Sequence, residues 1–271
     1  MGPLGSGMIA LASNDDGIWS EGLRVMVEAL ARAGMEVVVA APRRDMSGLG
    51  KSIRFPVRLE PASFPGAAHA LAGEGPPASI VYAAIRLLRR QGVEPSLVAS
   101  GVNHGPNLGA EDLLTSATIG AALEAAFQGV PAIAVSTWSR ASRLTGEERA
   151  IALEVVRRAA PIVAGSGAGA VISINIPRAP IGAAAVRPAF NRYDVDVVVR
   201  GGEVHPLMSE DRIYSNHDPP PGTDLWAYRR RLITVVPIGV DPPLCPGERE
   251  WRLAEEVARS LESIPGVRRG S

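Results

Sequence analysis

Two adjacent carboxylates follow an apolar segment near the start of the chain. The segment "MIALA" (residues 8–12) leads into "SNDDG" (13–17), so that Asp15 and Asp16 stand side by side where the apolar run ends. Adjacent carboxylates repel each other, and each loses hydration if it lies in a cleft. The pair is therefore typical either of a solvated turn or of a site in which a cation lies between the two side chains.

Two further polar loops also come directly after apolar, strand-like segments. They are "APRRDMSGLGKS" (41–52) and "GVNHGPNLG" (101–109). In an open parallel sheet, the loops at the carboxyl ends of the strands meet at one edge, where ligands bind. Hard oxygen donors of this kind suit Mg²⁺, Mn²⁺ or Ca²⁺ rather than a structural zinc, and a divalent cation would offset the repulsion between the carboxylates. The donors in the three loops are Asp15, Asp16, Ser47, Asn103 and Asn107.

Glycines and hydroxyls in and after these loops predict an anion site. "SGLG" (47–50) and "GPNLG" (105–109) supply backbone N–H groups that an anion can approach, and "TSAT" (115–118) places hydroxyls at an expected helix N-terminus. Each feature also has a structural interpretation. Ser47 could cap a turn, Asn103 could satisfy backbone groups, and a lone histidine such as His104 often packs rather than catalyses.

The elements that must position these loops alternate between strand and helix. Residues 56–77, rich in proline, are expected to form a loop region. The alternation predicts a parallel sheet with right-handed crossovers and helices on both faces, which is a Rossmann-like three-layer α/β/α fold. Apolar runs predict strands over 8–13, 35–41, 96–100, 132–136 and 170–176, and helical spacing predicts helices over about 20–34, 78–91, 116–128 and 145–164.

The pattern changes after Pro177. Short β-like segments ("DVDVVV", "RIYSN" and "LITVV") and turn signals follow, and a final helix is expected over about 247–263. We expect a catalytic domain over 8–176 and, over 177–271, a C-terminal extension that completes the fold. The final helix carries an apolar stripe that must be buried, and the prolines before it could direct it away from its own sheet. The alternative is a helix that packs on its own domain.

Charge and cysteine content argue against several functions. Lys and Arg together number 28, as do Asp and Glu, so there is no overall basic field to recruit nucleic acid or a membrane surface. The single cysteine cannot form an intramolecular disulfide, and no apolar run is long enough to cross a membrane, so we expect a cytoplasmic protein. Residues 1–7, with the segment "GPLGS", are interpreted as an expression-vector scar that precedes a natural start at Met8.

The chain resembles the SurE (stationary-phase survival protein) family. The matching stretches are "SNDDG", "AAPRRDMSGLGKSI", "SGVNHGPNLG", "TSATIGAALE" and "PPGTDLWAYRRRLITVVPI", in the family's order over roughly residues 8–240. The resemblance implies a metal-dependent 5′/3′-nucleotidase, or acid phosphatase, that hydrolyses nucleoside monophosphates. It implies one Mg²⁺ or Mn²⁺ per subunit, held by Asp15, Asp16, Ser47 and Asn103. It also implies a homodimer or homotetramer in which C-terminal elements exchange between subunits.

We expect Asp15 and Asp16 to act in catalysis as well as in metal binding. One of them could accept the proton of the attacking water or protonate the leaving group, and the sequence does not separate ligand from base. The phosphate oxygens are expected to be held by groups from all of these loops, namely Asn14, Gly48, Asn107, Ser116 and Thr118.

The chain departs from the family pattern at a few positions. "GPPAS" (75–79) stands where the family has Gly-Thr-Pro-x-Asp, "SAT" (116–118) stands for Ser-Gly-Thr, and "SIR" (52–54) stands for Ser-Ile-Thr. The changes spare the expected metal ligands and put substrate preference in question, so a non-catalytic nucleotide-binding protein of the same fold is the alternative. A dinucleotide-dependent Rossmann enzyme is disfavoured, because no Gly-x-Gly-x-x-Gly follows the first strand.

Overall fold

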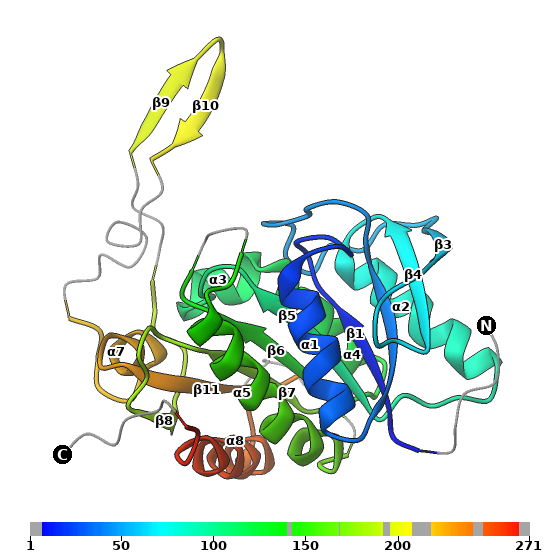
Figure 1. Cartoon of the computed structure of the whole chain (residues 1–271). Helices are drawn as coiled ribbons and strands as arrows, with labels where there is room; N and C mark the ends of the chain where they lie inside the picture. The colour runs from blue at the N-terminus through cyan, green and yellow to red at the C-terminus, as the bar shows by residue number, and fades with distance from the viewer. Residues whose placement is uncertain are drawn as a thin grey trace.

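A nine-stranded mixed sheet organises the chain, with the strand order β3-β4-β2-β1-β5-β6-β7-β11-β8 (Figure 1). The computed structural model describes residues 7–139, 143–167, 169–191, 196–207, 218–240 and 246–265. The strands are β1 (Ile9–Ser13), β2 (Glu36–Pro42), β3 (Arg58–Ala62), β4 (His69–Glu74), β5 (Leu97–Asn103), β6 (Ala132–Ser136), β7 (Val171–Asn175), β8 (Gly182–Ala185) and β11 (Leu232–Ile238).

The centre of the sheet is parallel, from β4 through β2, β1, β5 and β6 to β7. These inner strands are apolar along almost their whole length because both faces of the sheet are covered by helices. The covered faces form two apolar cores. The expected three-layer α/β/α fold is therefore confirmed.

Helices cover the two faces of the sheet in separate sets. The first set is α1 (Glu21–Arg32), α5 (Gly146–Ala164) and α8 (Glu248–Leu261), and the second is α2 (Pro77–Arg90), α4 (Ala117–Phe127) and α7 (Asp224–Arg229), with the short helix α3 (Gly109–Thr115) before α4. Ser20 caps α1 as predicted, because its Oγ accepts the N–H of Leu23 at 3.3 Å. None of the helices in the described ranges is long and apolar enough to cross a membrane.

The expectation of a loop region over 56–77 is wrong, because β3 and β4 lie within it. β3 pairs antiparallel with β4 at the edge of the sheet, where Pro61 can be accommodated without breaking a ladder on both sides. The segments "RLEPA" and "HALAGE" lack the β-branched residues that mark the other strands. They become strands because β2 offers an edge to pair with.

Part of the C-terminal extension is built into the main sheet. β11 lies between β7, to which it is antiparallel, and β8, to which it is parallel. The prolines before α8 do not direct it away from its own sheet: its apolar stripe is buried in the same core as α1 and α5. The stripe consists of Leu253, Ala254, Val257, Ala258 and Leu261.

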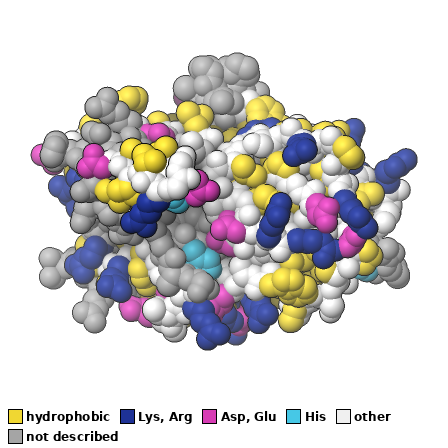
Figure 2. All heavy atoms as spheres, turned by 90° about the horizontal axis from the view of Figure 1, so that it is seen from above, with side chains coloured by type: hydrophobic (Ala, Val, Ile, Leu, Met, Phe, Trp, Pro, Cys, Tyr) yellow, Lys and Arg dark blue, Asp and Glu magenta, His cyan; other side chains and the backbone are white. Residues whose placement is uncertain are grey.

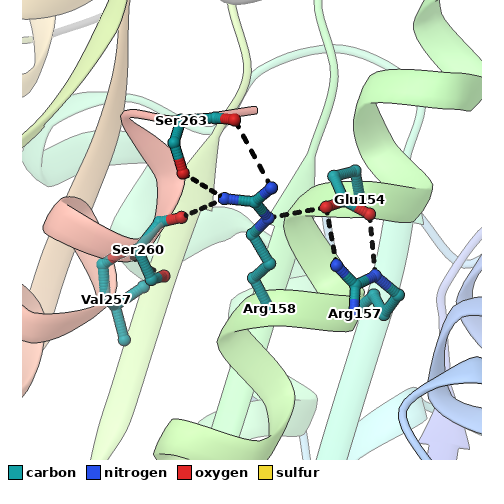
Figure 3. A network of polar contacts seen from close by, with 6 residues as sticks. All are labelled: Glu154, Arg157, Arg158, Val257, Ser260 and Ser263. Carbon is teal, nitrogen blue, oxygen red and sulfur yellow. Dashed lines mark hydrogen bonds and ion pairs between the residues drawn. The ribbon is translucent and has the colours of Figure 1, made fainter. Parts of the chain in front are cut away.

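Arg158 fixes α8 to α5. Its Nη1 donates to the carbonyl oxygen of Ser260 at 2.9 Å and to Ser263 Oγ at 2.6 Å, while its Nε donates to Glu154 Oε1 at 2.6 Å (Figure 3). Hydrogen bonds from Arg157, then from Arg158, lower the pKa of the Glu154 carboxyl to about 2. In this structure α8 therefore completes the core of its own chain.

A separate hairpin projects from the body of the molecule (Figure 1). It consists of β9 (Val197–Arg200) and β10 (Glu203–Pro206), joined through Gly201 and Gly202, which both have positive φ. The β-like segment "DVDVVV" is thus partly a strand, whereas "RIYSN" (212–216) lies outside the described residues.

Candidate metal and phosphate site

Three loops meet at the carboxyl edge of the parallel strands, as the sequence predicts. The first turn of α1, which follows the loop after β1, packs against the end of β5, since a Cβ on Gly22 would lie 1.9 Å from the carbonyl oxygen of Val102. The loop after β2 is joined to the loop after β1 by a hydrogen bond of 2.8 Å from the backbone N–H of Met46 to the carbonyl oxygen of Asp15. Figure 2 looks down on this edge and shows acidic and histidine side chains near the middle, with Lys and Arg side chains on both sides.

Asp15 and Asp16 lie at the centre of these loops. Asp15 is 3% exposed, and its Oδ1 accepts a hydrogen bond of 2.6 Å from Thr118 Oγ1 at the start of α4. Burial, then the charge of Asp16, raises the pKa of the Asp15 carboxyl to about 7. Burial and the charge of Asp45 raise the pKa of Asp16 to about 7 as well, although the backbone N–H of His104 opposes that shift. The pair is thus a buried site with excess negative charge and not a solvated turn.

The residues present fit a hard divalent cation. Asp16 Oδ2 is buried and has no hydrogen-bond partner, so a strong acceptor beside a second carboxylate is left for a positive group to neutralise. No cluster of three or more His, Cys, Asp or Glu side chains suited to a metal occurs in the described part of the chain. The expected donor set has two carboxylates, and its other members are amide and hydroxyl oxygens.

Asp45 is a third carboxylate near the pair that the sequence reasoning missed. Its charge raises the pKa of both Asp15 and Asp16. Its Oδ1 accepts hydrogen bonds from Ser47 N at 2.8 Å and from Ser47 Oγ at 2.6 Å. Ser47, an expected ligand, is exposed and bonded to Asp45. The available signal was the carboxylate in "RRDMS", two residues before the serine.

Asn103, an expected ligand, lies at the same edge of the sheet. It is the last residue of β5, and its Nδ2 donates to the carbonyl oxygen of Gly105 at 2.8 Å. Its backbone carbonyl accepts from Thr137 N at 3.0 Å and Thr137 Oγ1 at 3.1 Å. The bond to Gly105 orients the side-chain amide and leaves Oδ1 as the atom that could bind a cation. His104 follows, with a buried Nδ1 that has no hydrogen-bond partner.

The loop after β2 is packed tightly on α4. A Cβ on Gly120 would lie 2.4 Å from the carbonyl oxygen of Gly50, so only glycine allows this approach. Lys51 Nζ forms an ion pair of 2.6 Å with Glu124, which is 4% exposed, and lies 4.9 Å from the ring centroid of Phe127. These contacts hold the loop that carries Asp45 and Ser47 in place.

The expected phosphate contacts divide into two groups. Asn107, Ser116 and Thr118 lie along the rim between β6 and α4, and Thr118 also contacts Asp15 directly. Asn14 also holds its loop: its Nδ2 donates to the carbonyl oxygen of Gly17 at 3.0 Å and to Ser20 Oγ at 2.6 Å.

The local structure also places Gly48 and Ser116, two of the expected phosphate contacts. Gly48 is exposed, with a φ of 77°, and its missing side chain would face open space. Ser116 caps α4 by accepting the N–H of Ile119 at 3.2 Å.

Asp224 is a buried anchor near the candidate site that the sequence reasoning did not single out. It is 2% exposed, and its Oδ2 accepts the N–H of Gly109 at 2.7 Å, while its Oδ1 accepts the N–H groups of Ala189 at 2.8 Å and Leu225 at 2.7 Å. Burial raises its pKa to about 6 even though these three bonds oppose the shift. The aspartate of "PPGTD" therefore anchors the loop that carries Asn107.

Replacing Asp224 with Ala is expected to lower the free energy of unfolding by about 3 kcal/mol, because the buried N–H groups of Gly109 and Ala189 lose their acceptor. Urea unfolding followed by circular dichroism measures the change. Asp218→Ala removes an exposed carboxylate from the same segment and serves as the control. A loss in D224A no larger than that of the control would show that the anchor is unimportant.

None of the departures from the family pattern is an expected metal ligand. Ser79, at the start of α2, is fully buried, and its Oγ accepts the N–H of Arg54 at 2.7 Å, so two of the departures contact each other. Pro76 precedes α2 without a side-chain cap, and Ala117 is the buried first residue of α4.

The fold and the site together define a class of protein. It is a Rossmann-like α/β protein with a candidate cation site, and an adjoining anion site, at the carboxyl edge of its sheet. The family model described as survival protein SurE matches residues 10–195. The chain belongs to the SurE family.

Relatives from distant organisms cover most of the chain. The 5′-nucleotidase SurE of Aeropyrum pernix is 37% identical over 215 residues, which are 77% of this chain and 79% of the relative. That of Methanopyrus kandleri is 36% identical over 253 residues, 86% of this chain and 92% of the relative. The crystal structure of the SurE protein from Aquifex aeolicus matches with a TM-score of 0.70 and 29% identity, over 86% of this chain and 94% of that one.

Proposed function

We propose that this chain is a divalent-metal-dependent nucleotidase that hydrolyses nucleoside monophosphates to nucleoside and phosphate. The observation that carries the proposal is the buried Asp15 beside Asp16, whose buried Oδ2 has no hydrogen-bond partner, in a member of the SurE family. Relatives named 5′-nucleotidase support hydrolysis at the 5′ position. Nothing in the site favours the non-catalytic alternative.

The metal would be held by Asp15, Asp16 and Asn103, with Ser47 as the fourth expected ligand. A divalent cation supplies positive charge to the phosphoryl oxygens and makes water a stronger nucleophile. Asp45 adds a negative charge close to both aspartates and bonds Ser47, so it positions that residue.

The protein's own groups bind and orient the phosphate. Asn107, Ser116 and Thr118 would contact the non-bridging oxygens, whose charge changes during transfer. We propose that either Asp15 or Asp16 accepts the proton of the attacking water or protonates the leaving oxygen. The reaction breaks the bond between phosphorus and the ester oxygen and forms one between phosphorus and the oxygen of water.

Phosphate release from adenosine 5′-monophosphate, with and without a chelator, tests the function. Release that requires Mg²⁺ or Mn²⁺ supports a metal-dependent nucleotidase. Stoichiometric binding of the nucleotide with no release under any metal would identify a binding protein of the same fold.

We also propose that the chain assembles into a homodimer or homotetramer through its C-terminal region, and that the β9–β10 hairpin is the contact. The valines Val197, Val199 and Val204 are 54%, 68% and 62% exposed. A lone two-stranded hairpin is marginally stable in water, so these side chains require a surface to cover them. A second copy of the chain provides one.

The triple variant Val197→Ser, Val199→Ser and Val204→Ser is expected to shift the assembly toward monomer, as measured by light scattering at micromolar concentration. Glu203→Ser, a polar change on the same hairpin, serves as the control and leaves the particle mass unchanged. A monomeric wild-type protein at that concentration would contradict the proposal.

A further inference from the structure

We propose that a pocket beside the candidate site binds the part of the substrate beyond the scissile phosphate, and that it favours nucleotides carrying a second phosphate. The pocket is a cavity of about 650 Å³ lined by residues that include Trp138, Tyr228, Arg178 and Arg231. The proposal rests on the proposed function, because it concerns the remainder of the same substrate.

The walls of the pocket continue directly from the residues that hold Asn107. Asn107 N donates to Asn175 Oδ1 at 2.7 Å, and Asn107 Nδ2 donates to Ser136 Oγ at 2.8 Å. Ser136 ends β6 and Asn175 ends β7, so the residues that follow each strand, Trp138 and Arg178, lie next along the same edge. A nucleotide whose phosphate contacts Asn107 can therefore extend into this pocket.

Two aromatic side chains from different elements line the cavity. Trp138 is half-buried and packs against the core beneath α1 and α5, which fixes its ring. Tyr228 of α7 packs against Leu108, the neighbour of Asn107. Fixed aromatic rings bind bases of any sequence by stacking, because every base has a π-face. The pocket thus suits a nucleobase.

The charged side chains of the pocket are all basic. They are Arg178, Arg229 and Arg231, and none of the described residues that line the cavity is Asp or Glu. Within the described residues, Arg178 and Arg231 form no ion pair or side-chain hydrogen bond. The proposed function assigns the scissile phosphate to Asn107, Ser116 and Thr118 beside the metal, and not to these arginines. Guanidinium groups in the pocket therefore match a further phosphate.

The backbone of the pocket is strained at two positions. Ala179, with a φ of 45°, and Arg231, with a φ of 59°, are the non-glycine residues with left-handed backbone in the described part of the chain. Both line this pocket, and the N–H of Ile181 donates to the carbonyl oxygen of Arg231 at 2.8 Å, which joins the two loops. Such conformations cost energy and gather at ligand sites.

The double variant Arg178→Ala and Arg231→Asn tests whether these arginines bind a second phosphate. Asn is chosen at position 231 because it tolerates the left-handed backbone there. For adenosine 3′,5′-bisphosphate we expect KM to rise roughly tenfold or more, the loss that follows from removing charged hydrogen bonds. For adenosine 5′-monophosphate we expect KM and kcat to change less than about threefold, because it has no second phosphate to lose contacts.

Arg230→Ala provides the matched control. This substitution removes one positive charge next to Arg231, whereas the double variant removes two, and the Arg230 guanidinium lies 4.3 Å from the ring centroid of Trp226 and does not line the pocket. Equal KM values of the double variant, the control and the wild type for the bisphosphate would overturn the proposal.

Fluorescence of the chelator-treated protein supplies a readout that does not depend on catalysis. Adenosine 3′,5′-bisphosphate is expected to quench the tryptophan emission of wild type, and Trp138→Phe is expected to abolish most of the quench while retaining binding. If no phosphate is released from any phosphomonoester, the proposed function is wrong. The fluorescence titration still shows whether the pocket binds the bisphosphate. Unchanged quenching in Trp138→Phe would overturn the assignment of the base to this ring.

Discussion

The variant Asp15→Asn is expected to release phosphate from adenosine 5′-monophosphate at least about 100-fold more slowly than wild type, which is the scale of losing a charged contact to the transition state. The fold should remain, because the amide oxygen of Asn can still accept the hydrogen bond that Thr118 Oγ1 gives at 2.6 Å. Initial rates at saturating substrate and metal measure the effect. Asp16→Asn is expected to behave in the same way.

The same substitution should stabilise the metal-free protein at pH 8. In the folded chain the pKa of Asp15 is about 7, well above the 3.8 of an unperturbed aspartate, so the folded state binds more protons than the unfolded state between these values. Stability therefore falls as the pH rises from about 4 through about 7 and stays low above it. Removing the charge should raise the free energy of unfolding at pH 8 by on the order of 1 kcal/mol or more.

Glu74→Gln is a suitable control, because it removes an exposed carboxylate at the end of β4 and should change neither the rate nor the pH dependence. Wild-type rates in both Asp15→Asn and Asp16→Asn would mean that the pair is only a turn. A metal-free Asp15→Asn protein less stable than wild type at pH 8 would contradict the excess negative charge assigned to the site.

Removal of divalent metal should abolish phosphate release, and Mg²⁺ or Mn²⁺ should restore it. All the expected ligands are oxygen atoms, and two of them are carboxylates whose repulsion has no compensating cation within the described side chains. Dialysis against EDTA, followed by titration with each metal, measures the requirement. Full activity of the metal-free protein would contradict the mechanism.

Thermal unfolding provides a second measure of the metal. A ligand at 100 times its Kd stabilises the folded state by about 2.7 kcal/mol, so the wild-type Tm should rise by several degrees when metal is added. The rise should be larger at pH 8 than at pH 6, because the carboxylates must lose their protons to bind the cation. Asp16→Asn should lose most of the rise, whereas Glu74→Gln should keep it.

Much of the fold could be predicted because the inner strands are buried on both faces. Their continuous apolar runs, as in 132–136, mark them without reference to the rest of the chain. β3 and β4 could not be predicted in this way, because an edge hairpin rich in Ala, Pro and Gly has no distinctive pattern. The position of β11 between β7 and β8 depends on tertiary pairing, which no local pattern encodes.

In the candidate site, too, residues at strand ends could be predicted, and residues placed by tertiary contacts could not. Asp15, Asp16 and Asn103 could be predicted because they directly follow or end buried strands, whose ends must meet at one edge. The bond from Ser47 to Asp45 depends on the local turn. Asp224 acts through N–H groups far away in sequence, so its importance could not be read from its neighbours.

The anchoring of Gly109 by Asp224 has a consequence for how the chain becomes active during its synthesis. The expected metal ligands all lie before residue 104, whereas the carboxylate that fixes the Asn107 loop, and β11 behind it, leave the ribosome more than 100 residues later. A nascent chain can therefore gather its metal ligands before its phosphate loop is fixed. We therefore expect the Asn107 loop to become fixed only after the segment that carries Asp224 has been synthesised.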